Sequence, residues 1–524
     1  MISYGEDHLG GPPLRTQVCV VGSGPAGITL AHYLVKRGLD VILLEGSRTF
    51  GRDPNVDLSL QSDSNAYDWN DNNWLYNGES TGYLSQSEPH FLIQPSRDFP
   101  GYPGWERERI YGGTGTHWGG QSRPLDALTF EQRPGFPGWP ITREMLDPYY
   151  EEACAFMGLY GPYYSPDSRR IPGYNFTAEF WANELGSGYA VAAAQGFDVD
   201  MYQFPPQSFI RFQSRRYQDG KTIGESAARV ILNASLLDIE RQNGNVSALS
   251  VGVMTNNTSS DSNLTKPQNA GQFTVEADAY VLACGAVANA RLLLLSGFGE
   301  DNDLIGRYLM GQPLATGVNA VSTFANWLSP PESNLIQYIG NLDPKFGLNA
   351  LKGVLTPEAE VARQHQIGSV WFGTDGTSNY YHELLPEYTS RVMLSDSVDP
   401  VFGQRQTKVD WQLNPNEATN YETLAQLFTT AVQAKDPGAS VAVTPWADLE
   451  NTMVFNGHHL GTTRMSASAA DGVVDSDLKM HGVDNLYVAG SSIWASAGIS
   501  NPTFSIITFS IRLAEHLEHR LGTG

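Results

Sequence analysis

Residues 15–47 read RTQVCVVGSGPAGITLAHYLVKRGLDVILLEGS, and this stretch decides the fold. A short apolar, β-rich run is followed by a glycine-rich turn and then by a segment with apolar residues at helical spacing. Pro25 suits the first turn of that helix and Gly38 suits its end. A second apolar run follows and ends at Glu45. The order strand, turn, helix, strand predicts a βαβ unit on a parallel sheet.

The turn of this unit has the spacing G-x-G-x-x-G. Gly22 permits a sharp turn, Gly24 lets the backbone approach a pyrophosphate, and Gly27 lets the helix pack closely on the strand. Backbone N–H groups of the helix N-terminus, beside Ser23, favour phosphates. Glu45 follows Gly22 by 23 residues, where a carboxylate can accept hydrogen bonds from ribose hydroxyls. We therefore predict a dinucleotide site on a Rossmann-type unit.

Two further strand–glycine–helix patterns lie far along the chain. Residues 276–296 read as a strand, a turn and a helix, and residues 485–493 read as a strand that ends in glycine. A helix should then begin near Pro502. Because these units are far apart in sequence, we expect one sheet assembled from distant segments. The residues expected to contact the cofactor in these parts of the chain are Ala283, Gly285, Gly490, Ser491, Asn501, Pro502 and Thr503, and Leu236 is expected to contact it from a separate segment.

Size and charge exclude several classes of protein. The 524 residues correspond to roughly two to four domains, and 41% hydrophobic residues are enough for a large core. The net charge of −23 disfavours binding to nucleic acid or to anionic lipid. No apolar run is long enough to span a membrane, and no signal peptide is recognisable, so we expect a cytoplasmic protein. The sequence does not indicate an oligomeric state.

Three cysteines are widely spaced, at positions 19, 154 and 284. No CxxC pattern occurs, so neither a zinc ribbon nor a disulfide framework is indicated. Cys19 and Cys284 lie within apolar runs, and we expect both in the core.

Taken together, these segments resemble the glucose–methanol–choline (GMC) family of FAD-dependent oxidoreductases. The resemblance is strongest to the branch that holds pyranose oxidase, glycoside 3-oxidases and the large subunits of gluconate and fructose dehydrogenases. It implies FAD as cofactor and an α/β + β fold: a discontinuous Rossmann-type FAD-binding domain and a substrate-binding domain on an antiparallel sheet. The implied FAD-binding domain comprises residues 1–150, 221–310 and 446–524, and the substrate-binding domain comprises residues 151–220 and 311–445. The matching stretches are residues 18–45, 111–120, 138–153, 280–296, 390–413 and 457–517.

Residues 112–120, GGTGTHWGG, form a loop that is too rich in glycine for a helix or a regular strand. The resemblance implies that this loop touches the isoalloxazine ring. A histidine placed like His117 carries the flavin covalently in pyranose oxidase, whereas related dehydrogenases with histidine before tryptophan hold FAD non-covalently. We expect non-covalent FAD and keep the covalent link through His117 as the alternative. The residues of this loop expected at the cofactor are Gly113, Gly115, Thr116, His117 and Trp118.

Residues 456–465, NGHHLGTTRM, contain two adjacent histidines. No cysteine, HExxH or second histidine at helical spacing accompanies them, so we expect no metal site. Oxidation of an alcohol requires a base that is neutral at the working pH, which suits histidine. The resemblance places the active-site histidine three residues before a Gly-Thr pair, and Gly461-Thr462 assigns this role to His458. His459 should then point elsewhere, into packing or a backbone hydrogen bond.

Asn501 precedes Pro502 at the start of the last helix. Asparagine is a favoured helix N-cap, so a purely structural role is one interpretation. The resemblance implies a second role, in which Asn501 faces the substrate hydroxyl beside the base. Both roles are compatible, because the backbone can cap the helix while the amide faces the pocket. The helix N-terminus would also favour negative charge on the flavin.

The resemblance therefore implies an enzyme that oxidises a secondary hydroxyl of a sugar or glycoside, at carbon 2 or 3, with oxygen as acceptor. The alternatives are a dehydrogenase that serves a quinone or cytochrome partner, an oxidase of another natural-product alcohol, and a flavin-bound lyase. In the substrate-binding part, residues 390–413 should form two strands around a turn. Residues 370–372 and Trp411 should pack in a core rather than line a sugar pocket.

Overall fold

The computed structural model describes most of the chain. The described residues are 2–47, 111–116, 118, 120–159, 170–171, 174–175, 196–203, 205, 228–255, 268–300, 303–321, 351–372, 379–399, 401–435, 437–450, 454–455 and 457–522.

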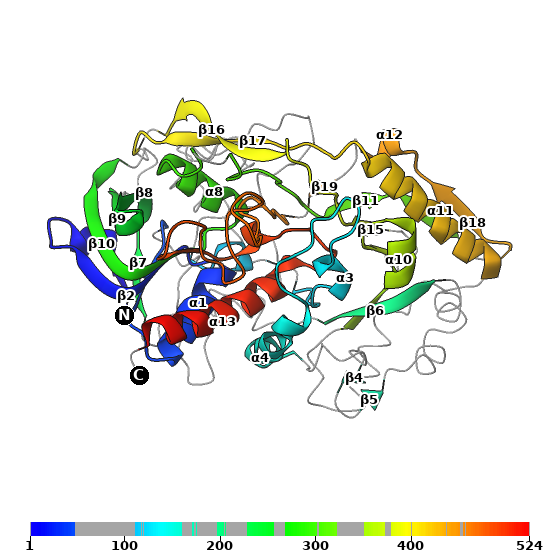
Figure 1. Cartoon of the computed structure of the whole chain (residues 1–524), viewed down its shortest axis with the longest axis horizontal. Coiled ribbons are helices and arrows are strands. Elements are labelled where there is room, and N and C mark those ends of the chain that lie inside the picture. Colours follow the sequence, from blue (N-terminus) through cyan, green and yellow to red (C-terminus); the bar gives the residue numbers. More distant parts are fainter. Residues whose placement is uncertain are drawn as a thin grey trace, which may run out of the picture.

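The main sheet joins segments from both ends of the chain, as the sequence predicts (Figure 1). In spatial order its strands are β1 (Ile2–Tyr4), β7 (Arg229–Leu232), β3 (Val41–Leu44), β2 (Leu14–Val21), β10 (Asn269–Leu282), β9 (Asn245–Met254) and β8 (Ser235–Gln242), and β20 (Leu486–Val488) also pairs with β10. The pairs from β1 to β10, and the pair of β10 with β20, are parallel. Strands β9 and β8 extend the sheet in antiparallel pairs.

Strands β2, β10 and β20 end at the same edge of the sheet. Leu282 pairs with Val21 on one side and with Val488 on the other. Each of these strands is followed by a turn with a glycine at positive φ: Gly22, Gly285 and Gly490. The carboxyl edge of a parallel sheet is where ligands bind in such folds, so the turns predicted from distant segments meet at one site.

Helices cover both faces of the main sheet. Helix α1 (Pro25–Lys36) packs on β2 and β3, and α13 (Pro502–Leu521) packs against α1. On the other side, α8 (Ala286–Leu295) contacts β8. The apolar stripe expected on the last helix is confirmed, because Phe504, Ile507, Ile511 and Ala514 are all buried.

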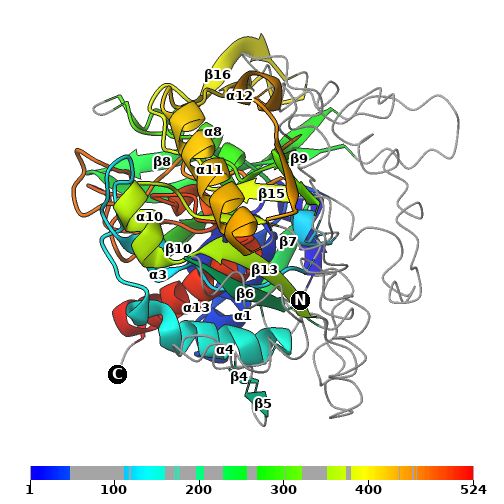
Figure 2. The same ribbon diagram turned by 90° about the vertical axis from the view of Figure 1, so that its right-hand side faces the viewer.

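A second sheet is antiparallel throughout its pairs, as expected for the substrate-binding part. Its strands, in spatial order, are β19 (Val454–Phe455), β11 (Pro313–Thr316), β15 (Asn379–His382), β14 (Val370–Phe372), β13 (Leu351–Pro357) and β6 (Phe197–Gln203). Helices α10 (Ala359–His365) and α11 (Glu417–Lys435) lie at the end of the molecule away from the main sheet, and they face the viewer in Figure 2. Strand β19 belongs to this sheet although its residues lie within 446–524, the range expected to belong to the FAD-binding domain. The domain boundaries themselves remain a prediction.

Residues 390–413 form a ribbon of two antiparallel strands, β16 (Arg391–Val398) and β17 (Arg405–Asp410), as predicted. The ribbon is a sheet of its own, and β16 contacts α8. Trp411 and Val370 are buried, which agrees with the expected core packing. The side chains of Trp371 and Phe372 lie outside the described part.

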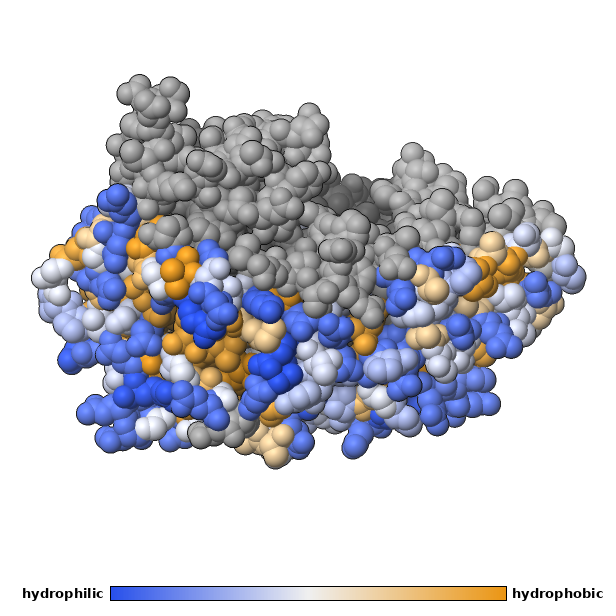
Figure 3. Space-filling model, turned by 90° about the horizontal axis from the view of Figure 1, so that it is seen from above, coloured by the Kyte–Doolittle hydropathy of each residue, from blue (hydrophilic) through white to orange (hydrophobic). Residues whose placement is uncertain are grey.

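The remaining elements are short or peripheral. They are η1 (Gly5–His8), η5 (Gly113–Thr116), α3 (Ala127–Phe130), η6 (Glu144–Leu146), α4 (Asp147–Met157), β4 (Arg170–Ile171), β5 (Tyr174–Asn175), β12 (Val318–Val321), β18 (Ser440–Val443), α12 (Trp446–Leu449) and η9 (Ser491–Ile493). Within the described ranges, no helix combines the length and apolar character needed to cross a bilayer. Among the residues drawn in colour in Figure 3, hydrophilic ones cover much of the surface, and apolar ones gather toward the middle of the left half.

Candidate active site

The turns at the carboxyl edge of the main sheet surround a cavity of about 470 Å³. This volume is in the range of ligand pockets in proteins. The lining includes most of the residues predicted for the site: Gly22, Ser23, Gly24, Glu45, Gly113, Gly115, Trp118, Leu236, Ala283, Gly285, His458, Gly490, Ser491, Asn501, Pro502 and Thr503. The structure thus brings together residues that the sequence spreads over almost 500 positions.

The three glycines of the first turn have the distinct surroundings that were predicted. Gly22 has a φ of +98°, and a Cβ atom there would lie 2.8 Å from the carbonyl oxygen of Ala283. At Gly27 a Cβ atom would lie only 1.8 Å from the carbonyl oxygen of Gly22, so this glycine lets α1 pack closely. A Cβ atom at Gly24 would meet nothing within 4 Å, because this residue faces the cavity. Gly27 lies behind the turn and is absent from the cavity wall.

Glu45 is held rigidly at the end of β3. Its side chain is 7% exposed. One carboxylate oxygen accepts a hydrogen bond from the backbone N–H of Ser23 at 3.2 Å, and the other accepts from that of Ser47 at 2.8 Å. The hydroxyl of Ser23 donates to the same carboxylate. The carboxylate is therefore fixed at the cavity wall.

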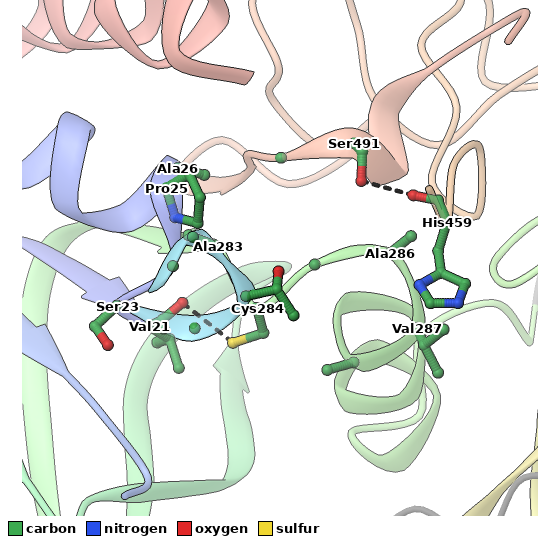
Figure 4. A pocket seen from close by; sticks show the side chains of 18 of the residues that line it. Val21, Ser23, Pro25, Ala26, Ala283, Cys284, Ala286, Val287, His459 and Ser491 are labelled. Atoms are coloured by element: carbon green, nitrogen blue, oxygen red, sulfur yellow. Dashed lines mark hydrogen bonds between the residues drawn. The ribbon is translucent and has the colours of Figure 1, made fainter. Parts of the chain in front are cut away.

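The end of β10 forms the opposite wall (Figure 4). Ala283 and Cys284 face the turn at Val21 and Ser23, and α8 begins just beyond them. The thiol of Cys284 donates to the carbonyl oxygen of Val21 at 3.2 Å. The expected core packing is confirmed for Cys19, which is fully buried, and holds only in part for Cys284. Cys284 packs against the core, but β10 ends two residues earlier, so it lies in the turn and is half-buried at the cavity.

The glycine-rich loop lies against the first turn. A Cβ atom at Gly113 would be 3.3 Å from the Cα of Gly24, and the N–H of Gly112 donates to the carbonyl oxygen of Ser23 at 3.0 Å. Thr116 ends η5, and its side chain lies outside the described part. His117 lies outside the described residues.

His458 and Asn501 meet at one end of the cavity. Nε2 of His458 and Nδ2 of Asn501 are 3.5 Å apart. Asn501 is the N-cap residue of α13, but its side chain makes no capping hydrogen bond. The amide therefore faces the imidazole while the backbone starts the helix. An amide nitrogen can only donate, so this contact favours an unprotonated Nε2.

Burial, and to a smaller extent the adjacent His459, lowers the pKa of His458 to about 3. Desolvation disfavours the charged imidazolium, and a like charge next to it has the same effect. An imidazole with such a pKa is neutral at physiological pH. It can therefore accept a proton from a group in the cavity.

His459 is oriented differently from its neighbour. Its ring lies near Val287 at the start of α8, and its carbonyl oxygen accepts a hydrogen bond from the hydroxyl of Ser491 at 2.7 Å (Figure 4). His459 is buried but also lines the cavity, whereas we expected it to point elsewhere. Arg464 is structural: it donates to the carbonyl oxygen of Asp471 at 2.6 Å and covers the ring of Tyr308. Among the described residues, no three His, Cys, Asp or Glu side chains gather as metal ligands.

Several cavity residues were missed by the sequence reasoning. Phe402 and Gln404 come from the turn between β16 and β17, and Arg291 comes from α8. The side chain of Gln404 donates to the carbonyl oxygen of Leu237 at 2.6 Å, which fixes the turn over β8. No local pattern marks these residues, because they reach the cavity only through tertiary contacts. Gln121, directly after the 112–120 loop, and Ser235, directly before Leu236, also line it.

The cavity suits a large polar cofactor. Four of its side chains carry a buried polar atom with no hydrogen-bond partner among the described residues: Nε1 of Trp118, Oε1 of Gln121, Oγ of Ser235 and Oδ1 of Asn501. Buried polar atoms are nearly always satisfied in the functional state. These groups, the open backbone at Gly24 and the carboxylate of Glu45 match the phosphates, ribose and flavin amide groups of FAD.

Comparisons with known proteins agree with this geometry. Models of the GMC oxidoreductase family match residues 223–314 and 386–510, and an FAD binding domain model matches residues 15–58. The chain is 23% identical to the fructose dehydrogenase large subunit of Gluconobacter japonicus, over 98% of this chain and 99% of the relative. It is 25% identical to the 6'''-hydroxyparomomycin C oxidase of Streptomyces lividus, over 95% of this chain and 91% of the relative.

Solved structures share the fold. An FAD-dependent oxidoreductase from Chaetomium thermophilum superposes with a TM-score of 0.60 at 16% identity, over 97% of this chain and 100% of that chain. The α/β sheet with a separate antiparallel sheet, predicted from sequence, is thus confirmed as the fold. The chain belongs to the GMC oxidoreductase family, and it is an FAD-dependent enzyme that acts on alcohol groups.

Proposed function

We propose that this enzyme oxidises a secondary hydroxyl of a sugar or glycoside to a ketone, and that His458 accepts the hydroxyl proton. The observation that carries the proposal is the contact of His458 with Asn501 at the cavity wall, 3.5 Å between the two side-chain nitrogens. A substrate hydroxyl beside this pair would meet a neutral base and an amide. Oxygen is the electron acceptor in the proposal.

The chain's own groups account for the proton and for the orientation of the substrate. Nε2 of His458 takes the proton as the C–H bond breaks, so no protonated carbonyl has to form. The amide of Asn501 can hold the same hydroxyl oxygen and fix the direction of the carbon. Bound FAD supplies the acceptor for the hydride that leaves this carbon. Pro502 and Thr503, at the N-terminus of α13, place a positive helix end at the same wall.

The names of two relatives support the substrate class. One acts on fructose and the other on a hydroxyparomomycin, so both names point to sugar-like alcohols. The relatives include an oxidase and a dehydrogenase, so a quinone or cytochrome partner is the competing acceptor. Asparagine rather than histidine at position 501 resembles the pyranose oxidase branch, which favours a ring hydroxyl.

The test is reduction of the bound flavin by a panel of sugars and glycosides without oxygen. We expect bleaching by at least one member of the panel and a ketone as product. The His458→Ala variant should fold and keep FAD but reduce it about 10²–10⁴-fold more slowly, the usual contribution of a general base. His481→Ala is the matched control, because His481 contacts the backbone of Ser466 and does not line the cavity.

If the flavin in the His458→Ala enzyme bleaches as fast as in the parent, His458 is not the base. If no sugar or glycoside bleaches the flavin while simple alcohols do, sugars are excluded as the substrate class. Mixing the reduced enzyme with oxygen then decides the acceptor, because slow reoxidation excludes an oxidase. Acid precipitation tests the cofactor link: we expect the yellow colour to remain in solution, as non-covalent FAD would.

A further inference from the structure

The segment that leads into Asn501 is held by a side chain next to the second sheet. Gln312 immediately precedes β11 and is fully buried. Its side-chain nitrogen lies within hydrogen-bond distance of three backbone carbonyl oxygens, those of Ala497 at 3.1 Å, Gly498 at 2.9 Å and Ser500 at 3.0 Å. Because all three neighbours are acceptors, the position requires an N–H donor.

A buried carboxylate holds the same segment from the other side. Glu383 immediately follows β15 and is 0% exposed. One of its oxygens accepts from the N–H of Gly498 at 2.8 Å. The other accepts from the N–H of Ser369 at 2.8 Å and from the guanidinium of Arg133 at 3.0 Å, which compensates the charge. Two apolar side chains could fill this space without the cost of desolvating a buried ion pair. What Glu383 adds is therefore the hydrogen bond from Gly498.

Further contacts leave the segment little freedom. The hydroxyl of Tyr202, in β6, donates to the carbonyl oxygen of Ile499 at 2.9 Å. The hydroxyl of Ser500 donates to the carbonyl oxygen of Pro124 at 2.6 Å. Gly498 has a φ of +58°, and a Cβ atom there would lie 3.0 Å from the hydroxyl oxygen of Thr129. The backbone of residues 497–500 is thus fixed at consecutive positions, directly before the residue that faces His458.

We propose that Gln312 and Glu383 are positioning residues for the reaction: they hold residues 497–500 and so keep the amide of Asn501 opposite the imidazole of His458. Asn501 lies between this segment and α13. The buried face of α13 fixes the chain on the other side of Asn501. A misplacement of about 1 Å in an active site can cost about 100-fold in rate. The inference rests on the proposed function, because it assumes that Asn501 takes part in the reaction.

The first experiment compares Gln312→Met with Asn485→Leu. Methionine matches the length of glutamine and is flexible, so the fold should tolerate it. Asn485 is the control because its amide also bonds the backbone, at Val246, but does not line the cavity. We expect Gln312→Met to slow anaerobic flavin reduction about ten- to hundred-fold, while the substrate concentration at half-maximal rate stays nearly constant. Asn485→Leu should change the rate of reduction less than about two-fold.

A second readout does not depend on activity. Hydrogen exchange of peptides that contain residues 497–501 should be faster in Gln312→Met than in the parent, and unchanged in Asn485→Leu. Glu383→Gln keeps an acceptor for Gly498, so its exchange and its rate should lie between those of the parent and Gln312→Met. Unchanged exchange in Gln312→Met would overturn the inference, whatever the rate.

The decisive measurement is a double-mutant cycle with Asn501→Ala. If Gln312 acts through Asn501, adding Gln312→Met to a slow Asn501→Ala enzyme should change the rate of reduction by less than about two-fold. Full additivity of the two losses overturns the inference while the proposed function stands. An Asn501→Ala enzyme as fast as the parent overturns both the inference and the proposed part of Asn501, and leaves the base to be judged from His458→Ala.

Discussion

At the scale of single residues, the environment of His458 makes a prediction about pH. Burial lowers the pKa of its imidazole to about 3, far below its ordinary value near about 6.5. The imidazole is therefore neutral, and can act as a base, at any pH above this pKa. Protonation inactivates it only as the pH falls toward the pKa. We expect the rate of anaerobic flavin reduction, at saturating substrate, to stay level from about pH 8 to about pH 5.

Stopped-flow measurements across this range check the expectation, provided that the FAD content and the fold are intact at each pH. A rate that falls by half near pH 6.5 would mean that the imidazole is solvated in the working enzyme. The same profile in His458→Ala serves as the control, because any titration that persists there belongs to another group.

The sequence identifies residues well where a local pattern is specific. The resemblance to the GMC family, through Gly461-Thr462 and Pro502, points to His458 and Asn501, and the structure places both side chains at the cavity; their catalytic roles stay predictions. The cavity positions of Phe402 and Gln404 could not be predicted, because they depend on where the ribbon turn meets β8. The partial exposure of Cys284 at the cavity could not be predicted, because an apolar run does not show where β10 ends.

At the scale of elements, the two glycines Gly24 and Gly27 after β2 have different roles. A substitution at Gly24 should affect FAD binding, and a substitution at Gly27 should affect the stability of the protein. Gly24 has a φ of −68°, which alanine can adopt, and a Cβ atom there would point into open space. Gly24→Ala should therefore fold normally and bind FAD at least about tenfold more weakly, because the methyl group occupies space meant for the phosphates. At Gly27 the methyl group would collide with the carbonyl oxygen of Gly22.

Gly27→Ala should consequently lower the stability of the protein even without FAD, by about 1–3 kcal/mol, as overpacking does. Thermal unfolding of the apoproteins and FAD titration of each separate the two effects. Equal FAD affinity in Gly24→Ala and the parent would show that the phosphates do not lie at this turn.

At the scale of the whole molecule, sequence patterns predict the main sheet and the family resemblance implies the second one, but neither predicts how the two sheets meet. The βαβ unit and the later strand–glycine–helix segments follow from apolar patterns with glycine at the turns. The contacts that join the second sheet to the site do not, because Gln312 and Glu383 are ordinary polar residues in the sequence and acquire their partners only in the fold. Long-range hydrogen bonds leave no periodic pattern.

The cavity wall combines segments from the first 50 residues, the middle and the last 70 residues of the chain, so the cofactor should stabilise the whole molecule. A ligand that binds only the folded state adds about 2.7 kcal/mol of stability at a concentration 100 times its Kd. We therefore expect the melting temperature of the apoprotein to rise with the logarithm of the FAD concentration.

Differential scanning calorimetry at several FAD concentrations measures this rise, with Gly24→Ala as the matched variant. Because that variant should bind FAD more weakly without a change in the apoprotein, its curve should shift to higher FAD concentrations and start from the same melting temperature. A melting temperature that does not respond to FAD would mean that the segments around the cavity unfold independently of the site. The same result would contradict a cofactor that contacts β2, β10 and α13 together.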